Sequence, residues 1–425
     1  MVGVELLELE AKSCFNFLWD QANTDHKSPG YGLILDSTDK AGVASIASVG
    51  FGLSAIPIGI ERGWIGYGQG FERALGTLRT LIKSVDNYRG FYAHFVDMKT
   101  GKRYRRCEYS TIDTAILING AITSGEYFGG TIKALAEKIY KRADWNFIVD
   151  KANKRFYMHY WPEVFPEGHS GLGGQWDYFA EQLIMYILAA GSPTFKLGAE
   201  LYYNMGKLRD CYNGSIYVRG WYNSLFIHQF SHAWFDSAKY VDRDGINWFD
   251  NSVKATLANR QYCIDNPEGF KTYGENSWGL TACMGPSGYN GRYGSLPPSI
   301  VQEINKNDGT VPICGPAGSI AFTPRESMEA LLYAYKNFPQ LWGEYGFYDS
   351  YNLDQDKPWF SKDYIGINKG ITLLMIENYF SGLIWDLYMK NSYIKDGLKA
   401  LDFSKLEGDR TRQAYDPTYL SPQSA

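Results

Sequence analysis

Long apolar segments with helical spacing recur along this 425-residue chain and alternate with loops rich in glycine, proline and aromatic residues. In the segment 43–61 almost every residue is small or apolar, and Gly63 follows at the position that glycine favours just past a helix. A helix that is apolar on all sides is buried among other elements. The pattern therefore predicts a core built from packed helices.

Ten segments carry this helical pattern, namely 5–20, 43–61, 67–85, 111–127, 131–147, 175–190, 195–208, 246–263, 325–337 and 370–390. The loops between them are long, and loops of that length usually carry function. Within the loops, 91–96 and 217–221 have the composition of short hairpin strands. Because no linker interrupts the chain, we predict one all-α domain over 1–425, a ring of paired helices with a pocket at one end.

Composition narrows the class of ligand. With 42 Lys and Arg against 46 Asp and Glu, the net charge is −4, which disfavours nucleic-acid binding and electrostatic membrane docking. No apolar run approaches the roughly 20 residues that span a bilayer. The 16% of aromatic residues suit a sugar-binding cleft, because the C–H faces of a pyranose pack on aromatic rings. A large core with extra tyrosine explains the same composition.

Metal centres and disulfide frameworks are not expected. The six cysteines include no C-x-x-C pair, and His228 and His232, four residues apart, lack a closely placed acidic third ligand. No metal or organic cofactor is therefore implied. The N-terminus lacks the basic and apolar regions of a signal peptide, so the chain as written is expected to be cytoplasmic, or periplasmic or secreted if a leader has been removed.

Two acidic positions are candidates for catalysis. Either Ser110 or Thr111 is a plausible N-cap, and Asp113 then lies in the first helical turn, where backbone N–H groups and the helix dipole stabilise a carboxylate; Asp113 either caps the helix or faces a pocket. On the predicted helix 175–190, Asp177 and Glu181 share one face. Glu181 directly precedes an apolar run, and desolvation raises a carboxyl pKa and favours general-acid chemistry. A solvated first turn is the alternative.

Three further groups are candidates for contacts with a sugar. Glu275, Trp278 and Tyr289 lie in a Gly-rich segment and suit a sugar subsite, although Trp278 could equally pack in the core with Glu275 as a helix cap. Asn368 opens the last long apolar helix. Glu377, inside that helix, must be paired if it is buried, as a pocket residue or in a structural salt bridge.

Taken in order along the chain, these segments resemble the glycoamylase-like family that contains bacterial endo-β-1,2-glucanases. The resemblance covers most of the chain and is carried by 47–53, 61–64, 110–115, 181–194, 276–282, 288–294, 308–310, 375–379 and 381–385. It implies an (α/α)6 barrel with long aromatic loops and a few short hairpins. It also implies a pocket that binds an oligo- or polysaccharide and an inverting hydrolysis by a pair of carboxyl groups.

The resemblance also suggests roles for individual residues. Glu181 matches the family's proton donor, and Asp113 matches another acidic pocket residue, which we favour for assisting the attacking water. The expected substrate-binding residues are Arg62, His169, Trp176, Asp177, Glu275, Trp278, Tyr289, Asn368 and Glu377.

Two departures from the family pattern bear on catalysis. Asn368 stands where an Asp is expected, and Met284 stands where an Asp would be familiar. An amide cannot accept a proton as a carboxylate does, and losing a general base costs about 10² to 10⁴ in rate. The leading hypothesis is a glycoside hydrolase that cleaves β-1,2-glucan in an endo manner. The alternatives are a carbohydrate-binding protein with a degenerate site, or a glucosidase or transglycosylase acting on another linkage.

Overall fold

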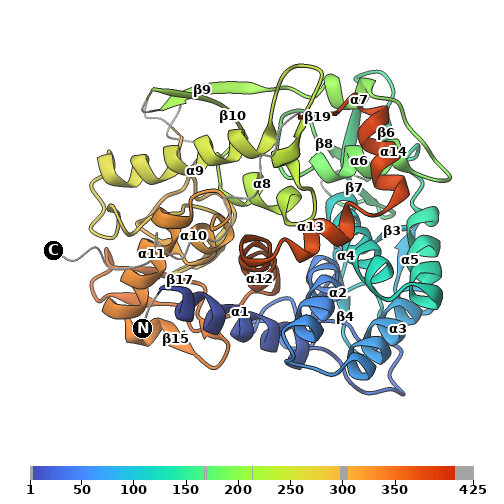
Figure 1. Cartoon of the computed structure of the whole chain (residues 1–425), viewed down its shortest axis with the longest axis horizontal. Coiled ribbons are helices and arrows are strands. Elements are labelled where there is room, and N and C mark those ends of the chain that lie inside the picture. Colours follow the sequence, from blue (N-terminus) through green and yellow to red (C-terminus); the bar gives the residue numbers. More distant parts are fainter. Residues whose placement is uncertain (1–2, 167, 169, 213, 297–304, 407–425) are drawn as a thin grey trace.

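The computed structural model describes residues 3–166, 168, 170–212, 214–296 and 305–406, in which fourteen α-helices alternate with short strands (Figure 1). The predicted helical core is confirmed. The longer helices are α1 (Gly3–Asp20), α2 (Ile46–Glu61), α3 (Tyr67–Lys83), α4 (Thr111–Phe128), α5 (Gly130–Arg142), α6 (Leu183–Gly191), α9 (Trp248–Asp265), α11 (Pro324–Asn337), α12 (Gly366–Phe380) and α14 (Ser392–Ala400). The short ones are α7 (Glu200–Tyr203), α8 (Phe226–Gln229), α10 (Cys314–Gly318) and α13 (Leu383–Tyr388).

The helices differ in how much of their surface is buried. All nine residues of α6 are buried, and α2, α4 and α12 are buried over most of their circumference, as their apolar sequences require. By contrast, α3, α5, α11 and α14 bury one face and expose the other. One contiguous hydrophobic core, running from Leu6 to Leu401, connects the two sets.

Glycines allow α2 and α4 to pack with their backbones in contact. A methyl group added at Gly50 would overlap the backbone of Ile116, and one added at Gly120 would overlap the backbone of Gly50. Side chains larger than hydrogen would therefore force the two helices apart. This close approach places the N-terminal ends of α2 and α4 side by side.

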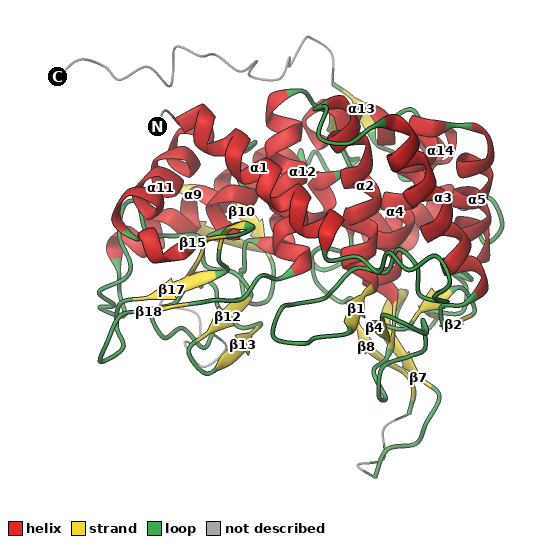
Figure 2. Ribbon diagram, turned by 90° about the horizontal axis from the view of Figure 1, so that it is seen from below, coloured by secondary structure: helices red, strands yellow, loops and turns green. Residues whose placement is uncertain are grey.

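Most of the strands and long loops gather at one end of the helices (Figure 2). They pair in small antiparallel groups: β1 (Val43–Ser45) with β4 (Phe95–Asp97), β2 (Asn87–Tyr88) with β3 (Phe91–Tyr92), β9 (Leu208–Tyr212) with β10 (Ser215–Arg219), β11 (Tyr240–Val241) with β19 (Ser404–Lys405), β12 (Cys283–Gly285) with β13 (Gly288–Asn290), and β15 (Trp342–Gly343) with β16 (Gly346–Phe347). The larger groups are β5 (Tyr109–Ser110), β7 (Arg155–Trp161) and β6 (Val149–Asp150) with β8 (Gly171–Gln175), and β14 (Val311–Pro312), β17 (Ser350–Asn352) and β18 (Trp359–Phe360). The two predicted hairpin segments, 91–96 and 217–221, fall largely in these strands.

Three predicted helices are wrong in extent. The helix expected over 175–190 begins only at Leu183, because 171–175 pairs with β7 and Phe179 N–H donates to the Gly206 carbonyl at 2.9 Å. The helix expected over 195–208 is reduced to α7. The one expected over 370–390 is divided into α12 and α13 at Gly382, whose φ of 69° is left-handed. In 175–190, strand pairing with β7 overrides the local helical spacing. In 370–390, a glycine interrupts the helix.

All six cysteines lie in the described part of the chain and are unpaired thiols. Among the described residues, no helix combines the length and the apolar character needed to cross a bilayer.

Candidate active site

The N-terminal ends of α2, α4 and α12 border a cleft at the loop end of the molecule. The cleft has two lobes, with cavity volumes of about 180 Å³ and about 150 Å³, which share His94, Asp113, Tyr289 and Ile367. The other residues lining the first lobe are Ala47, Ile112, Ile116, Glu181, Phe226, Phe230, Ala282 and Asn368. Those lining the second are Asp36, Ser37, Asp39, Lys40, Ser45, Phe95, Met284 and Ile365. Both lobes are lined mainly by apolar surface, and polar side chains are more numerous in the second lobe than in the first.

Asp113 is held at the start of α4. Ser110 is the residue that caps this helix, as one of the two predicted candidates: its Oγ accepts the Asp113 N–H at 3.2 Å and donates to Asp113 Oδ2 at 2.5 Å. Pairing of β5 with β7 fixes the strand that leads into the cap. The Asp113 carboxylate is thus both a helix-terminal group and part of the cleft lining.

Glu181 lies in the turn just before α6. Gln182 stabilises this turn, since its amide donates to the Tyr178 carbonyl at 2.7 Å and accepts the Ala180 N–H at 2.7 Å. The Glu181 side chain lines the first lobe, where burial raises its pKa to about 7, and the charge of Asp113 acts in the same direction. Glu181 can therefore hold a proton near neutral pH, as a general acid requires.

His94, between β3 and β4, lies between two carboxylates. No sequence pattern predicted it as a site residue. Its Nδ1 lies 2.7 Å from Glu108 Oε1, and its Nε2 lies 3.7 Å from Asp113 Oδ1. Burial lowers the pKa of His94, but the charges of Asp113, Glu108 and Asp36 outweigh it and raise the pKa to about 9. At neutral pH the imidazolium thus offsets part of the negative charge around Asp113. A lone histidine in an aromatic hairpin gives no sequence signal of this kind.

The loop 36–40, which matches no sequence motif, supplies four of the residues that line the second lobe. Lys40 Nζ pairs with Asp36 Oδ2 at 3.1 Å, and Ser37 Oγ donates to Asp39 Oδ1. The Lys40 ammonium lies 5.2 Å from the Phe95 ring centre. Carboxylate, hydroxyl and ammonium groups beside an aromatic ring provide the contacts that sugar hydroxyls and C–H faces require.

Asn368 lines the first lobe, and a buried carboxylate lies behind it. Asn368 Nδ2 donates to Asp349 Oδ1 at 2.7 Å, and the Met284 backbone N–H donates to Asp349 Oδ2 at 2.7 Å. Burial raises the pKa of Asp349 to about 6, although these hydrogen bonds act against the increase. Asp349 sits in an aromatic loop segment, and nothing in its sequence context indicated proximity to Asn368.

Tyr289 is the single predicted aromatic residue that the structure places in the cleft. It lies on β13, lines both lobes and is 50% exposed. The other two candidates are core residues: Trp278 is fully buried, and Trp176 is 7% exposed with its Nε1 donating to Thr111 Oγ1 at 3.2 Å. The core alternative therefore describes Trp278, and the expectation that Trp176 and Trp278 stack on sugars is not met by their positions.

Arg62 and Glu377 pair with each other at the end of the molecule opposite the cleft. Arg62 Nε lies 2.8 Å from Glu377 Oε2. Arg62 caps the C-terminus of α2, about 22 Å along the helix from Ala47 in the cleft, and Glu377 lies about 13 Å along α12 from Asn368. Of the two alternatives for Glu377, the structure shows the salt bridge.

The remaining predicted contacts lie outside the cleft lining or outside the described residues. Glu275 is exposed and pairs with Arg260 at 3.2 Å on the outer surface. Asp177 and Glu181 both precede α6 and lie outside any helix, so they do not share a helix face as predicted. His169 lies outside the described residues.

The pair His228 and His232, which could have formed a metal site, is engaged in the core. His232 contacts Ser237 Oγ at 2.6 Å and Ser252 Oγ at 3.0 Å, and burial lowers the pKa of both His228 and His232 to about 3. In the part of the chain that the structure covers, no three His, Cys, Asp or Glu side chains are placed to hold a metal ion.

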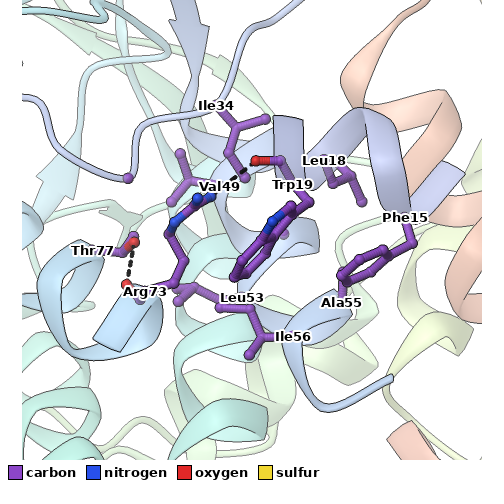
Figure 3. A pocket seen from close by; sticks show the side chains of 12 residues that line it. Phe15, Leu18, Trp19, Ile34, Val49, Leu53, Ala55, Ile56, Arg73 and Thr77 are labelled. Carbon is purple, nitrogen blue, oxygen red and sulfur yellow. Dashed lines mark hydrogen bonds between the residues drawn. The ribbon is translucent and has the colours of Figure 1, made fainter. Parts of the chain in front are cut away.

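A second cavity lies between α1, α2 and α3 (Figure 3). It is a recess of about 10 Å³, where the Arg73 guanidinium lies 4.1 Å from the Trp19 ring centre. A volume of that size holds at most one water molecule.

The structure combines a core of packed helices with an acidic cleft at the end where the loops gather. Comparison with known families shows to which family a protein of this class belongs. Residues 174–392 match the family model described as "Putative glucoamylase", and the chain belongs to this glycoamylase-like family. A solved structure from Bacteroides uniformis described in the same words is 32% identical, with a TM-score of 0.83 over 95% of this chain and 98% of that one. The resemblance inferred from the sequence is thus confirmed.

Two relatives are named for activities on β-1,2-linked glucose chains. The endo-β-1,2-glucanase of Chitinophaga pinensis, solved with sophorotriose and glucose, is 27% identical, with a TM-score of 0.82 over 95% of this chain and 99% of that one. The exo β-1,2-glucooligosaccharide sophorohydrolase of Parabacteroides distasonis is 28% identical over 95% of this chain. The chain spans 59% of the length of that curated relative.

Proposed function

We propose that this protein is a glycoside hydrolase that cleaves β-1,2-linked glucan, with Glu181 as general acid and Asp113 assisting the attacking water. The observation that carries the proposal is the placement of these two carboxyl groups in one lobe of the cleft, with the Glu181 pKa raised to about 7. Two carboxyl groups that differ in their tendency to hold a proton are what hydrolysis of a glycosidic bond requires.

In this mechanism Glu181 donates its proton to the glycosidic oxygen as the bond to the anomeric carbon breaks. Asp113 accepts a hydrogen bond from the water that attacks the opposite face of the sugar, so the anomeric configuration inverts. The His94 imidazolium, 3.7 Å from Asp113, orients that carboxylate and limits the repulsion among the acidic groups. Tyr289, half-exposed between the lobes, supplies a ring face for a pyranose.

The substrate is inferred from the relatives and from the shape of the cleft. Both characterised relatives act on β-1,2-linked glucose chains according to their names. The two lobes share four lining residues and have volumes of about 180 Å³ and about 150 Å³, which suits a chain of consecutive sugar units better than a single monosaccharide. Endo cleavage of the polymer is the form of the reaction that we favour.

We also infer that the helices close into an (α/α)6 barrel and form a single domain over 1–425. In support, the largely buried helices α2, α4, α6, α8, α10 and α12 alternate along the chain with α1, α3, α5, α7, α9 and α11, which gives six pairs before the final helices α13 and α14. The contiguous hydrophobic core from Leu6 to Leu401 agrees with one domain.

The decisive experiment is product analysis with linear and cyclic β-1,2-glucan, β-1,3-glucan and α-1,4-glucan, with optical rotation followed over time. Short β-1,2-oligosaccharides with inverted configuration at the new reducing end are expected. Cleavage of a different glucan would contradict the assigned linkage, and retention of configuration would contradict the mechanism.

A carbohydrate-binding protein is the second candidate, because Asn368 replaces the carboxylate expected at the cleft wall. It predicts measurable binding of β-1,2-glucan by calorimetry with no product after prolonged incubation. Detection of turnover by the wild-type protein, lost in Glu181→Gln, would rule it out.

A further inference from the structure

Asp349, just before β17, uses both of its carboxylate oxygens as acceptors. Oδ1 accepts the side-chain N–H of Asn368, and Oδ2 accepts the backbone N–H of Met284, each at 2.7 Å. Asp349 and Asn368 are both buried. An ionised carboxylate accepts hydrogen bonds and cannot donate them. The contacts of Asp349 are therefore complete only when its partners are donors.

This requirement fixes the orientation of the Asn368 amide. Because the amide nitrogen must face Asp349, the carbonyl oxygen points the other way. Asn368 lines the first lobe of the cleft, and within residues 3–296 and 305–406, as far as the structure describes them, its Oδ1 has no hydrogen-bond partner. The oxygen is thus an acceptor available to whatever occupies the lobe.

Asp349 itself is set behind the cleft wall. It lines a separate recess of about 10 Å³ together with Glu10, Asn368 and Lys369, which is room for one water molecule at most. Lys369 Nζ pairs with Glu10 Oε1 at 2.9 Å, and its positive charge also favours the ionised form of Asp349. Asp349 can therefore influence the first lobe through Asn368, whereas its other partner, Met284, lines the second lobe.

We propose that Asp349 is a positioning residue that holds the carbonyl oxygen of Asn368 toward the first lobe, where it accepts a hydrogen bond from a glucan hydroxyl or from the attacking water. This inference rests on the proposed function, since it takes glucan as the occupant. It also explains the amide at position 368. A carboxylate there would lie 2.7 Å from Asp349, and two carboxylates so close cannot both be ionised.

Exchanging the two side chains tests the proposal with nearly isosteric variants. In Asp349→Asn the side chain keeps one acceptor oxygen for two donors, so either Met284 N–H loses its partner or Asn368 turns its nitrogen toward the lobe. Asn368→Asp brings two carboxylates together. Each single variant is expected to lower kcat/KM about 10- to 100-fold, the usual cost of an unsatisfied buried polar group.

The double variant Asp349→Asn/Asn368→Asp is expected to recover activity to within about threefold of the wild type, because direct coupling makes the two changes non-additive. In it, the amide oxygen at 349 accepts the Met284 N–H, the amide nitrogen donates to the carboxylate at 368, and an acceptor oxygen still faces the lobe. A purely structural role for Asp349 predicts instead that the single variants lower the melting temperature and leave the kcat/KM of the folded protein unchanged, so that there is no loss to recover.

Asp242→Asn is the matched control. Asp242 is a buried carboxylate that also accepts two hydrogen bonds, from Tyr202 O–H at 2.6 Å and from Ile246 N–H at 2.8 Å, but it lies outside the residues lining the cleft. It is expected to lower the melting temperature with little change in kcat/KM.

The possible outcomes distinguish a failure of the positioning role from a failure of the proposed hydrolysis. An active wild type whose single variants keep full kcat/KM, or whose double variant is no better than the poorer single variant, contradicts the positioning role of Asp349 alone. An inactive wild type contradicts the proposed hydrolysis. The dissociation constant for β-1,2-glucan then replaces kcat/KM, and the same pattern of loss and recovery is expected for binding.

Discussion

At the scale of single residues, the cleft brings together ionisable groups that favour different charge states at neutral pH. Partial burial raises the pKa of the Glu181 carboxyl to about 7, whereas the carboxylates around His94 raise the pKa of its imidazole to about 9. Structural ion pairs also perturb pKa values, but these groups line one cavity, which is where shifted values indicate function.

Glu181→Gln is expected to lower kcat by about 10² to 10⁴, because the amide cannot donate the proton that the leaving oxygen needs. Its melting temperature should stay close to that of the wild type. Glu137→Gln is a suitable control, since Glu137 pairs with Lys141 at 3.2 Å on the outer helix α5. Full activity in Glu181→Gln would remove Glu181 from this role.

The pH dependence of the wild type should reflect the same carboxyl group. A general acid must be protonated, so kcat/KM is expected to fall as pH rises above about 7, the pKa of Glu181. The decline should approach tenfold per pH unit. An activity that remains constant from pH 7 to pH 9 would contradict a general-acid role for a group with this pKa.

The free energy of unfolding should also depend on pH, through His94. Unlike a carboxyl group, a histidine is charged when it is protonated. The folded-state pKa of His94 is raised, so the stability it contributes is fully present below its unfolded value near pH 6.5 and is lost as pH rises through about 9. The difference in free energy of unfolding between wild type and His94→Gln should therefore shrink from pH 6 to pH 10. Since each unit of pKa shift corresponds to about 1.4 kcal/mol, the decrease is of the order of a few kcal/mol. Urea titrations at both pH values measure it, and an unchanged difference would contradict the assignment.

At the scale of elements, the cleft depends on how closely α2 and α4 pack. The two helices begin side by side and supply Ala47, Ile112, Asp113 and Ile116 to the first lobe. Small shifts between them would move Asp113 relative to Glu181. Glycine at the crossing is thus a requirement of the site as well as of the core.

Gly120→Ala should destabilise the protein by about 1 to 3 kcal/mol, the usual cost of overpacking, because the added methyl group meets the backbone of Gly50. Gly68→Ala provides the matched control on the outer helix α3, where nothing lies within 4 Å of the added group. That variant should be neutral or stabilise by up to about 1 kcal/mol. Thermal unfolding of both proteins checks the contrast, and equal effects would show that the crossing tolerates side chains.

At the scale of the whole molecule, contacts between distant parts of the chain join its first two helices to α12. Glu10 in α1 pairs with Lys369 in α12, and Arg62 after α2 pairs with Glu377 in α12. The first pair lies behind the cleft wall and the second at the opposite end of the molecule. Stability and substrate contact are therefore separable along α12.

Arg62→Ala should lower the free energy of unfolding by about 3 kcal/mol, because Glu377 is left as a buried carboxylate without its partner. The KM for glucan should stay near the wild-type value, since Arg62 lies far from the cleft. Chemical denaturation and steady-state kinetics measure the two effects. An increase in KM with unchanged stability would place Arg62 at the substrate, as the sequence resemblance implied.

The sequence determined most of the helices and the two acidic residues Asp113 and Glu181, because apolar periodicity, helix capping and a carboxylate next to an apolar run are local patterns. Tertiary structure alone decided which residues meet in the cleft. It brought His94, Asp36 and Asp349 to the site, and it placed Trp278, Arg62 and Glu377 elsewhere. Those side chains come from segments far apart in the chain, and their environment depends on long-range packing and burial, which no local pattern encodes.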